Sequence, residues 1–265
     1  MTDLAILCPA IPQTVCRAAR VSASLPAMLL SKILDRLEAL YGPPRPPSIT
    51  DPFEMILYEN VAYLVSDERR DTAFQALRDR VGLTASRILS ASPKALLLVA
   101  ELGGMLPEQR VTKLLRSAQI AQERFQGDMR TVLKMPVLQA KKSLKLFPGI
   151  GEPGAEKILL FSGARPVLAL ESNGLRTLIR LGYGAEQKSY AATYRSVLEA
   201  VKDQIQQDCG WLIRAHQLLR RHGQELCKRS QPLCGSCPLT SGCRFYKQAR
   251  SGRPASLPAG YTSSA

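Results

Sequence analysis

The sequence contains little that would place it in a membrane or a secretory route. No apolar run approaches the roughly 20 residues that a membrane-spanning helix needs. The first residues, MTDLAILCPAIPQTVC, have no basic segment followed by an apolar stretch, so no secretory signal is predicted. Alternating strand patterns are scarce, and no internal repeat is present. We therefore expect an all-α protein of the cytoplasm, under reducing conditions and without a membrane partner.

Acidic residues are also in short supply. The 265 residues include 36 lysines and arginines but 22 aspartates and glutamates, which gives a formal net charge of +14. Such an excess favours a polyanionic partner, nucleic acid ahead of membrane, over a basic surface with no partner. Hydrophobic residues make up 45% of the chain, enough for a globular core, and the length allows one large domain or two small ones.

Two stretches of the chain concentrate the positive charge. One contains no acidic residue and five basic ones: Arg130, Lys134, Lys141, Lys142 and Lys145. The other has Glu225 as its one acidic residue among these basic residues: Arg214, Arg220, Arg221, Lys228, Arg229, Arg244, Lys247 and Arg250. Both stretches flank a motif described below, and this distribution further favours a nucleic-acid partner over a basic surface without one.

Four of the seven cysteines lie in one segment, CKRSQPLCGSCPLTSGC, from Cys227 to Cys243. The segment has one close pair, Cys234 and Cys237, where a structural zinc site commonly has two. Four thiolates can instead hold the corners of a [4Fe–4S] cubane across loops of unequal length. We expect this cluster ahead of zinc or unligated thiols. The other three cysteines stand apart and are expected to be ordinary buried or free thiols: Cys8, Cys16 and Cys209.

Apolar residues recur at helical spacing along most of the chain. A helix over 26–41 ends at Gly42, and Asp51-Pro52 opens another over 52–65, because proline fits the first turn. Further helices are predicted at 71–81, 93–102, 107–126, 130–134, 137–146, 154–162, 173–181, 187–205 and 208–223. We expect a flexible segment at the start and a disordered tail at the end: 1–25 and 248–265.

A glycine-rich turn, PGIG, joins two of these helices within LFPGIGEPGAEKILLF (146–161). Its glycines permit a tight hairpin whose backbone N–H groups point outward at a helix N-terminus. Such a hairpin suits a phosphate without reading any base, although a plain turn is the alternative. We expect DNA to contact the hairpin and the lysines that precede it: Lys142, Lys145, Gly149, Ile150 and Gly151.

With these motifs, the chain resembles the endonuclease III family of helix–hairpin–helix DNA glycosylases. The resemblance covers the N-terminal helix with its Pro-rich exit, the start DPFE of the next helix, the hairpin FPGIG, the segment WLIRAHQLLRRHGQELC and the cysteine spacing. It implies a two-domain all-α fold. One domain is a six-helix barrel with the hairpin, over 50–165. The other carries the iron–sulfur cluster and is built from 26–49 and 166–247.

The resemblance also implies a partner, a cofactor and an activity. The partner is double-stranded DNA with a lesion or mismatch, bound by a monomer that flips the damaged base out of the stack. The cofactor is a [4Fe–4S] cluster on these ligands: Cys227, Cys234, Cys237 and Cys243. Lys228, Arg229 and Arg244 are carried on the same loop, where we expect them to reach DNA phosphates.

The family's catalytic aspartate maps onto Glu171, within VLALESNG. A fixed carboxylate there stabilises the positive charge that develops on the sugar and activates a water. Glutamate is longer by one methylene, and a displacement of about 1 Å can cost about 100-fold in rate where positioning matters. The alternative is that Glu171 interacts with the N-terminus of the helix beginning near Ser172, which also favours an anion.

Strand-cleaving members of the family also carry a nucleophilic lysine in the hairpin. Pro153 occupies that position here, and Lys157 follows one helical turn later, where an ordinary surface lysine is expected. We therefore expect a monofunctional DNA glycosylase that hydrolyses the N-glycosidic bond. A non-catalytic DNA-binding protein that keeps the fold and cluster is the alternative, because Glu171 and Pro153 both depart from the family pattern.

Two residues of 52–65 resemble further functional positions of the family. Glu59 stands where adenine-removing relatives carry a catalytic glutamate, and a solvated helix face is the alternative. Tyr63 stands where the family often inserts a glutamine into the gap in the duplex. Its ring would stack in the vacated space, with core packing as the alternative.

Overall fold

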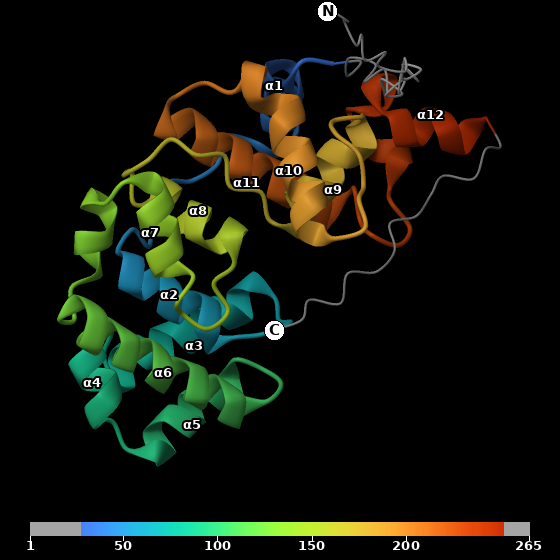
Figure 1. Cartoon of the computed structure of the whole chain (residues 1–265). Helices are drawn as coiled ribbons and strands as arrows, with labels where there is room; N and C mark the ends of the chain where they lie inside the picture. The colour runs from blue at the N-terminus through green and yellow to red at the C-terminus, as the bar shows by residue number, and fades with distance from the viewer. Residues whose placement is uncertain (1–27, 252–265) are drawn as a thin grey trace, which may run out of the picture.

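The computed structural model describes residues 28–251, and in this range the chain is all-α (Figure 1). Its longer helices are α1 (Leu30–Tyr41), α2 (Pro52–Val61), α3 (Asp67–Arg80), α4 (Ala85–Ser90), α5 (Pro93–Leu102), α6 (Pro107–Phe125), α7 (Val137–Leu144), α8 (Glu152–Phe161), α9 (Ser172–Leu181), α10 (Tyr190–Val201), α11 (Cys209–Glu225) and α12 (Arg244–Arg250). Short 3-10 helices are η1 (Met129–Lys134), η2 (Lys202–Gln204), η3 (Cys234–Ser236) and η4 (Thr240–Gly242). The β pairing in this range is a single bridge between Tyr63 and Gly104.

Helix boundaries follow local capping chemistry. α2 begins at Pro52 because the Asp51 carboxylate accepts hydrogen bonds from the backbone N–H groups of Phe53 at 2.9 Å and Glu54 at 3.2 Å. α3 begins at Asp67, four residues before the predicted start, because the Ser66 hydroxyl caps it. α4 and α12 were not predicted.

Some sequence expectations fall outside the described residues. Cys8, Cys16 and the N-terminal segment 1–25 belong to this part of the chain, as does most of the predicted tail. α12 runs to Arg250, so the helix enters the first residues of that tail. None of the helices in 28–251 is both long and apolar enough to cross a membrane.

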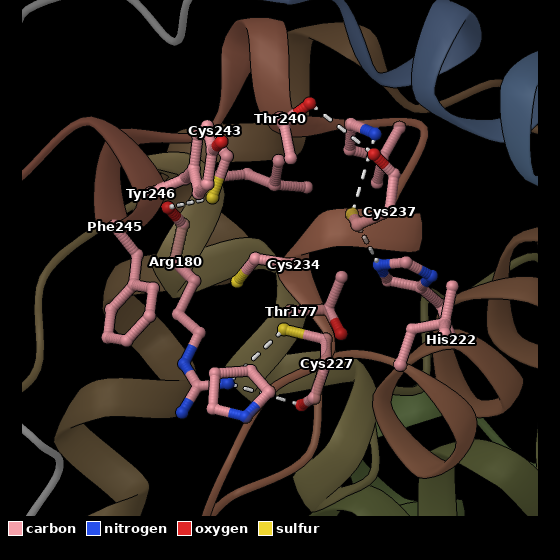
Figure 2. A pocket seen from close by; sticks show the side chains of 14 residues that line it. Thr177, Arg180, His222, Cys227, Cys234, Cys237, Thr240, Cys243, Phe245 and Tyr246 are labelled. Carbon is pink, nitrogen blue, oxygen red and sulfur yellow. Dashed lines mark hydrogen bonds between the residues drawn. The ribbon is translucent and has the colours of Figure 1, made fainter. Parts of the chain in front are cut away.

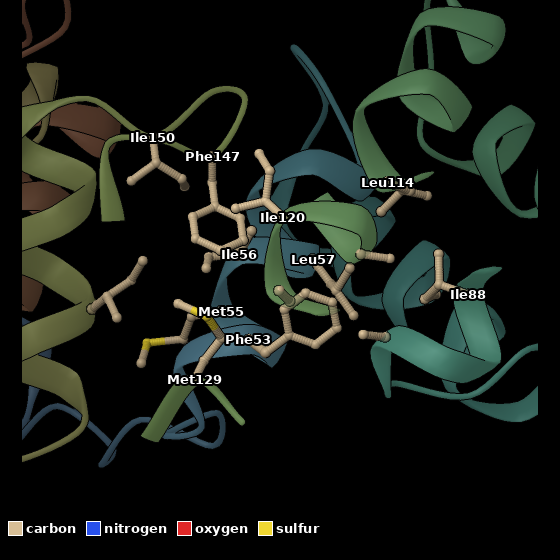
Figure 3. Packing of buried hydrophobic residues seen from close by; sticks show 14 of the residues in the cluster. Phe53, Met55, Ile56, Leu57, Ile88, Leu114, Ile120, Met129, Phe147 and Ile150 are labelled. Carbon is tan, nitrogen blue, oxygen red and sulfur yellow. The ribbon is translucent and has the colours of Figure 1, made fainter. Parts of the chain in front are cut away.

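Two hydrophobic cores organise the described residues. The first is built from α2 to α8 and packs Phe53, Ile56 and Leu57 of α2 against side chains of α4, α6 and the hairpin (Figure 3). The second joins α1 to α9, α10 and α11, which lie side by side in Figure 1 although more than 130 residues separate α1 from α9. Phe161, at the end of α8, packs against both cores. α8 therefore connects the hairpin to the second core.

Candidate active site and cysteine cavity

The predicted hairpin lies between α7 and α8. Phe147 and Ile150 are buried and anchor it to the first core, while Gly149 adopts a φ of +73° that favours glycine. The N–H of Ile150 donates to the carbonyl of Phe147 at 3.2 Å, so it closes the turn and does not point outward. Within residues 28–251, no acceptor contacts the N–H of Gly149 or Gly151. These two groups, with the N-terminus of α8, are the donors that the hairpin presents.

Asn60 supports the hairpin from α2, a role that the sequence did not reveal. The side chain is 4% exposed, and its amide donates to the carbonyls of Ile56 at 3.0 Å and Pro148 at 2.9 Å. A Cβ at Gly149 would lie 3.0 Å from the Asn60 side-chain oxygen, so the turn and this amide fit closely together. Asn60 therefore fixes the hairpin to the first core.

The lysines before the hairpin differ in their surroundings. Lys145 forms an ion pair with Glu152 at 2.7 Å, and Lys141 pairs with Glu152 and, at 2.7 Å, with Glu156. Lys142 is exposed, and no carboxylate in residues 28–251 pairs with it. Of the two lysines predicted to bind DNA, Lys142 is therefore the one without an internal ion pair in the described range.

A buried chain of polar contacts leads from the hairpin to Leu170. Glu156 is 5% exposed and accepts hydrogen bonds from Lys141 and from the hydroxyl of Tyr194. The same hydroxyl accepts a hydrogen bond from the backbone N–H of Leu170 at 3.2 Å. The backbone just before Glu171 is thereby held against α8.

Glu171 is the N-cap residue of α9. One carboxylate oxygen accepts from the backbone N–H of Gly174 at 2.7 Å, and the other accepts from the side-chain amide of Asn173 at 2.8 Å. The interaction with the helix N-terminus that we considered as an alternative is present. The same contacts also hold the carboxylate in one place, as catalysis requires, so capping and catalysis are compatible at Glu171.

Asn173 continues the hydrogen bonding towards the cysteine loop. The guanidinium of Arg176 donates to the side-chain oxygen of Asn173 at 2.7 Å, and to the carbonyls of Gly223 at 2.7 Å and Cys227 at 2.9 Å. Glu171 and the first cysteine of the loop are thus connected through two side chains of α9.

One face of α11 lies close to Glu171. Arg220 binds Asp67 through hydrogen bonds of 2.6 and 2.8 Å. Burial would lower the pKa of Arg220, but the hydrogen bond to Asp67 and the negative charges of Asp67 and Glu171 raise it overall. His216, one turn earlier, contacts the carbonyl of Ala169 through Nδ1 at 2.7 Å. Burial, with nearby Lys157 and Arg220, lowers the pKa of His216 to about 4.

Glu59 and Lys157 meet across α2 and α8. The ammonium of Lys157 donates to the Glu59 carboxylate, and a guanidinium nitrogen of Arg70 lies 4.0 Å from the other carboxylate oxygen. Burial opposes ionisation of Glu59, but Lys157 and Arg70 outweigh it and keep its pKa below the ordinary value. Side-chain exposure is 28% for Glu59 and 23% for Lys157. The expectations of an ordinary surface lysine and a solvated helix face are therefore wrong.

We call the residues that the charge of Arg220 links to Glu171, together with their ion-pair partners, the carboxylate junction. They come from α2, α3, α8, α9 and α11, and both hydrophobic cores contribute helices: Glu59, Asp67, Arg70, Lys157, Glu171, His216 and Arg220. Sequence reasoning identified Glu59 and Glu171. It missed the others as members of one site, because most of their contacts join residues far apart in the sequence, such as Glu59 and Lys157.

Tyr63 lies in the loop after α2, beside the loop that contains Gly103 and Met105. Its backbone N–H donates to the carbonyl of Gly103 at 3.0 Å, and its side chain is 37% exposed, so core packing does not account for it. Leu64 and Met105, on the two loops, are 76% and 64% exposed. We call Tyr63, Leu64 and Met105, which are exposed beyond the C-terminal end of α2, the apolar edge.

Several basic residues of the stretch around α11 form ion pairs with carboxylates of the chain. Arg214 binds Glu38 at 2.6 Å, Arg220 binds Asp67, and Arg221 binds Glu225 at 2.7 Å. Lys228 and Arg229 are exposed on the turn that follows. No carboxylate of the described residues forms an ion pair with either of them.

The four clustered cysteines line one cavity beneath the loop (Figure 2). Cys227, Cys234, Cys237 and Cys243 face it with His222 and Arg180, which are 1% and 5% exposed. His222 Nε2 lies 3.5 Å from the sulfur of Cys237, and the hydroxyl of Tyr41 contacts the other ring nitrogen at 3.1 Å. Burial raises the pKa of Cys237 to about 11, so this thiol needs a metal to become a thiolate near neutral pH.

The donor atoms around the cavity are not drawn together as a metal site. No group of three or more His, Cys, Asp or Glu side chains in residues 28–251 is arranged to hold a metal ion. A tetrahedral zinc with Zn–S bonds of about 2.3 Å would bring its sulfurs close together. In a cubane each thiolate binds a different iron, so the sulfurs stand further apart. Four cysteine thiols around one cavity are the donor set that a cubane uses.

No protein-family model matches the sequence. The chain is 26% identical over 209 residues to endonuclease III of Thermotoga maritima, an alignment that covers 79% of this chain and 90% of the relative. It is 24% identical over 196 residues to endonuclease III of Sulfolobus acidocaldarius, covering 73% and 82% of the two chains.

Two solved structures share the fold of this chain although their sequences are less than 20% identical to it. A trapped covalent intermediate of endonuclease III with DNA superposes with a TM-score of 0.66 at 18% identity, covering 83% of this chain and 97% of that one. A thermostable thymine-DNA glycosylase gives a TM-score of 0.66 at 16% identity, covering 83% and 95%. The chain therefore has the all-α helix–hairpin–helix DNA glycosylase fold and is a sequence relative of endonuclease III.

Proposed function

We propose that this protein is a DNA glycosylase of base-excision repair that acts on a damaged or mismatched base in double-stranded DNA. The observation that carries the proposal is Glu171, whose carboxylate is fixed by Gly174 and Asn173 at the junction of two cores. A carboxylate held in this way can stabilise the positive charge that a deoxyribose develops as its base departs.

The chemistry uses water as the nucleophile. The C1′–N bond breaks with its electron pair leaving on the base, and water adds to C1′ while Glu171 accepts the water proton. Pro153 has no amine to attack the sugar. The ammonium of Lys157 is engaged by Glu59. We therefore propose hydrolysis without a Schiff base, and hence no strand cleavage by the protein.

Glu59 is the second carboxylate that we propose to test. It resembles a catalytic position of adenine-removing relatives, and the structure supports a charged role by pairing it with Lys157 and Arg70. Two cations beside one carboxylate reduce its ability to accept a proton. We therefore assign proton transfer to Glu171 and charge balance within the junction to Glu59.

Docking of the duplex is proposed to use the hairpin, the cysteine loop and the apolar edge. The N–H groups of Gly149 and Gly151 and the ammonium of Lys142 would meet one stretch of phosphates. Lys228 and Arg229 would meet another. The half-exposed ring of Tyr63 would fill the space that a flipped nucleotide leaves.

The cofactor is proposed to be a [4Fe–4S] cluster held by the four cysteines of the cavity. When bound, it would order the loop that carries Lys228 and Arg229. Pure protein should then absorb broadly near 400 nm and contain about four irons per chain. Stoichiometric zinc without iron would contradict this assignment.

A DNA-binding protein without catalysis is the competing function. It is favoured by Pro153 and by the hydrogen bonds that already engage both Glu171 oxygens, one from the backbone of Gly174 and one from the side chain of Asn173. A glycosylase screen over duplexes that carry different lesions and mismatches separates the two, with alkali treatment to reveal abasic sites. We expect base release from at least one duplex and strand cleavage only after alkali. Tight lesion binding without any base release would establish the competing function.

A further inference from the structure

Arg180 occupies the cysteine cavity from the last turn of α9, and sequence reasoning gave it no role. Its guanidinium donates to the carbonyl of Lys228 at 2.7 Å, to that of Arg229 at 3.0 Å, and to the sulfur of Cys227 at 3.4 Å. Figure 2 shows the side chain reaching from α9 towards this end of the loop. One buried side chain thus holds the first turn of the cysteine loop.

Arg180 also contacts the other end of the loop. The thiol of Cys243 donates to the backbone carbonyl of Arg180 at 3.4 Å. The ring of Phe245 lies 4.5 Å from the Arg180 guanidinium carbon, in a cation–π arrangement. Arg180 therefore touches the first and the last of the four cysteines, together with the aromatic residue that follows the last one.

The positive charge of Arg180 is incompletely balanced by the residues around it. The side chain is 5% exposed, and among residues 28–251 no carboxylate forms an ion pair with it. Its Nε is buried without a hydrogen-bond acceptor. A buried cation and an unsatisfied donor are costly unless negative charge lies nearby. Neutral thiols do not supply this charge, whereas thiolates bound to iron do.

We propose that Arg180 is the positioning residue of the cluster: it holds the first turn of the ligand loop and the ring of Phe245 beyond the last cysteine, and it stabilises negative charge on the Cys227 thiolate. The inference rests on the cluster proposed above. Hydrogen bonds to cluster sulfurs are one of the means by which a protein sets the reduction potential. Reduction adds negative charge, so a cation beside Cys227 favours the reduced state and raises the potential.

The test compares Arg180→Gln and Arg180→Lys with Arg214→Gln in the full chain, purified without oxygen. Arg214 is a matched control because it pairs with Glu38 on α1, in the same core, and is absent from the cavity lining. Iron per chain, absorbance near 400 nm, the rate of iron loss to a chelator and the midpoint potential are measured. None of these depends on glycosylase activity.

We expect Arg180→Gln to lose iron about 10- to 100-fold faster than wild type, if the loss of metal affinity that follows removal of a ligand's partner appears in the rate of release. Its midpoint potential should be lower. The rate of iron loss and the potential of Arg180→Lys should lie between those of wild type and Arg180→Gln, because lysine keeps the charge and loses the planar fork. If Arg180→Gln does not fold, the potential of Arg180→Lys tests the inference. Arg214→Gln should match wild type.

Unchanged potential and iron loss in both Arg180 variants would overturn the inference while leaving the cluster in place. Equal losses in Arg180→Gln and Arg214→Gln would also overturn it, because the effect would then be general destabilisation. Wild-type protein without iron would defeat the cofactor proposal itself, which is a distinct outcome.

Discussion

The two ends of α9 carry opposite charges and serve different sites. Glu171 caps the N-terminus beside the carboxylate junction, and Arg180 projects from the last turn into the cysteine cavity. The helix dipole favours an anion at the first end and a cation at the second. Ten residues span about 15 Å, so one short rigid helix fixes the distance between the two sites.

The two sites balance charge in different ways. In the carboxylate junction most charged groups meet a partner of opposite sign, as Arg220 meets Asp67 and Lys157 meets Glu59. In the cavity a single buried cation faces four thiols. The charges of the junction are thus balanced mostly by other residues of the chain, whereas the cavity would gain its counter-charge if the thiols became thiolates on the proposed cluster. Its order should therefore depend on a metal, and that of the junction should not.

Loss of a cavity cysteine should give the largest effect. Cys237→Ala removes one proposed ligand, and because metal binding contributes directly to folding, we expect loss of iron and destabilisation of about 3 kcal/mol or more. Iron analysis and chemical denaturation measure both. Cys209→Ala is the control, because Cys209 does not line the cavity. This variant should keep the iron content of wild type. Full iron content in Cys237→Ala would exclude Cys237 as a ligand.

Mild acid should destabilise the junction through His216. Its folded pKa is about 4 against an ordinary value of 6.5, so between these values the unfolded chain binds a proton that the folded chain does not. Stability therefore falls as the pH drops, by about 2 kcal/mol from pH 7 to pH 5 for this residue alone. Denaturation of wild type and His216→Asn at both pH values measures it. The same pH dependence in both proteins would contradict the assignment.

The ion pair across α2 and α8 should show measurable coupling. Glu59→Gln and Lys157→Met each leave one partly buried charge with less compensation, so we expect a loss of about 1–2 kcal/mol for each, and a smaller loss than their sum for the double variant. Denaturation of the four proteins gives the coupling energy. The exposed pair Arg221–Glu225 is the control and should couple weakly. Additive losses at Glu59 and Lys157 would show that the pair does not act as a unit.

The smallest expected effect concerns DNA affinity near the hairpin. Lys142→Ala should reduce the slope of log affinity against log salt by about one, since each neutralised phosphate contributes about that amount. Lys145→Ala should change it less, because Lys145 must first leave Glu152. Equilibrium binding of duplex DNA over a salt series tests both. An equal change in slope for both variants would show that the ion pair with Glu152 does not compete with DNA phosphates for Lys145.

The cysteine cavity and the hairpin were predictable because each is encoded in a short segment. The spacing from Cys227 to Cys243 brings the thiols round one cavity, and PGIG forms the turn between α7 and α8. The start of α3 was encoded as well, in Ser66 and the acidic residues after it, although the apolar spacing alone placed it later. Local signals of this kind act over a few residues.

The carboxylate junction could not be assembled from local patterns. The Lys157 side chain was assigned to the surface because its helical turn shows nothing of the partner on α2. Asn60 gave no signal for its contact with Pro148, 88 residues away. Arg180 looked like one more basic residue of an amphipathic helix. Their roles depend on how the two cores meet, which is a property of tertiary packing.

The measurement that tests the account most directly is base release by Glu171→Gln, with iron content determined on the same protein. Glutamine can still accept the hydrogen bond from Gly174, so the helix cap, the cluster and the affinity for DNA should persist. Losing one electrostatic contributor of the transition state should slow base release by about 100-fold or more. We therefore predict near-complete loss of activity with about four irons retained per chain. Full activity in Glu171→Gln would contradict the central claim and direct the same experiment to Glu59→Gln.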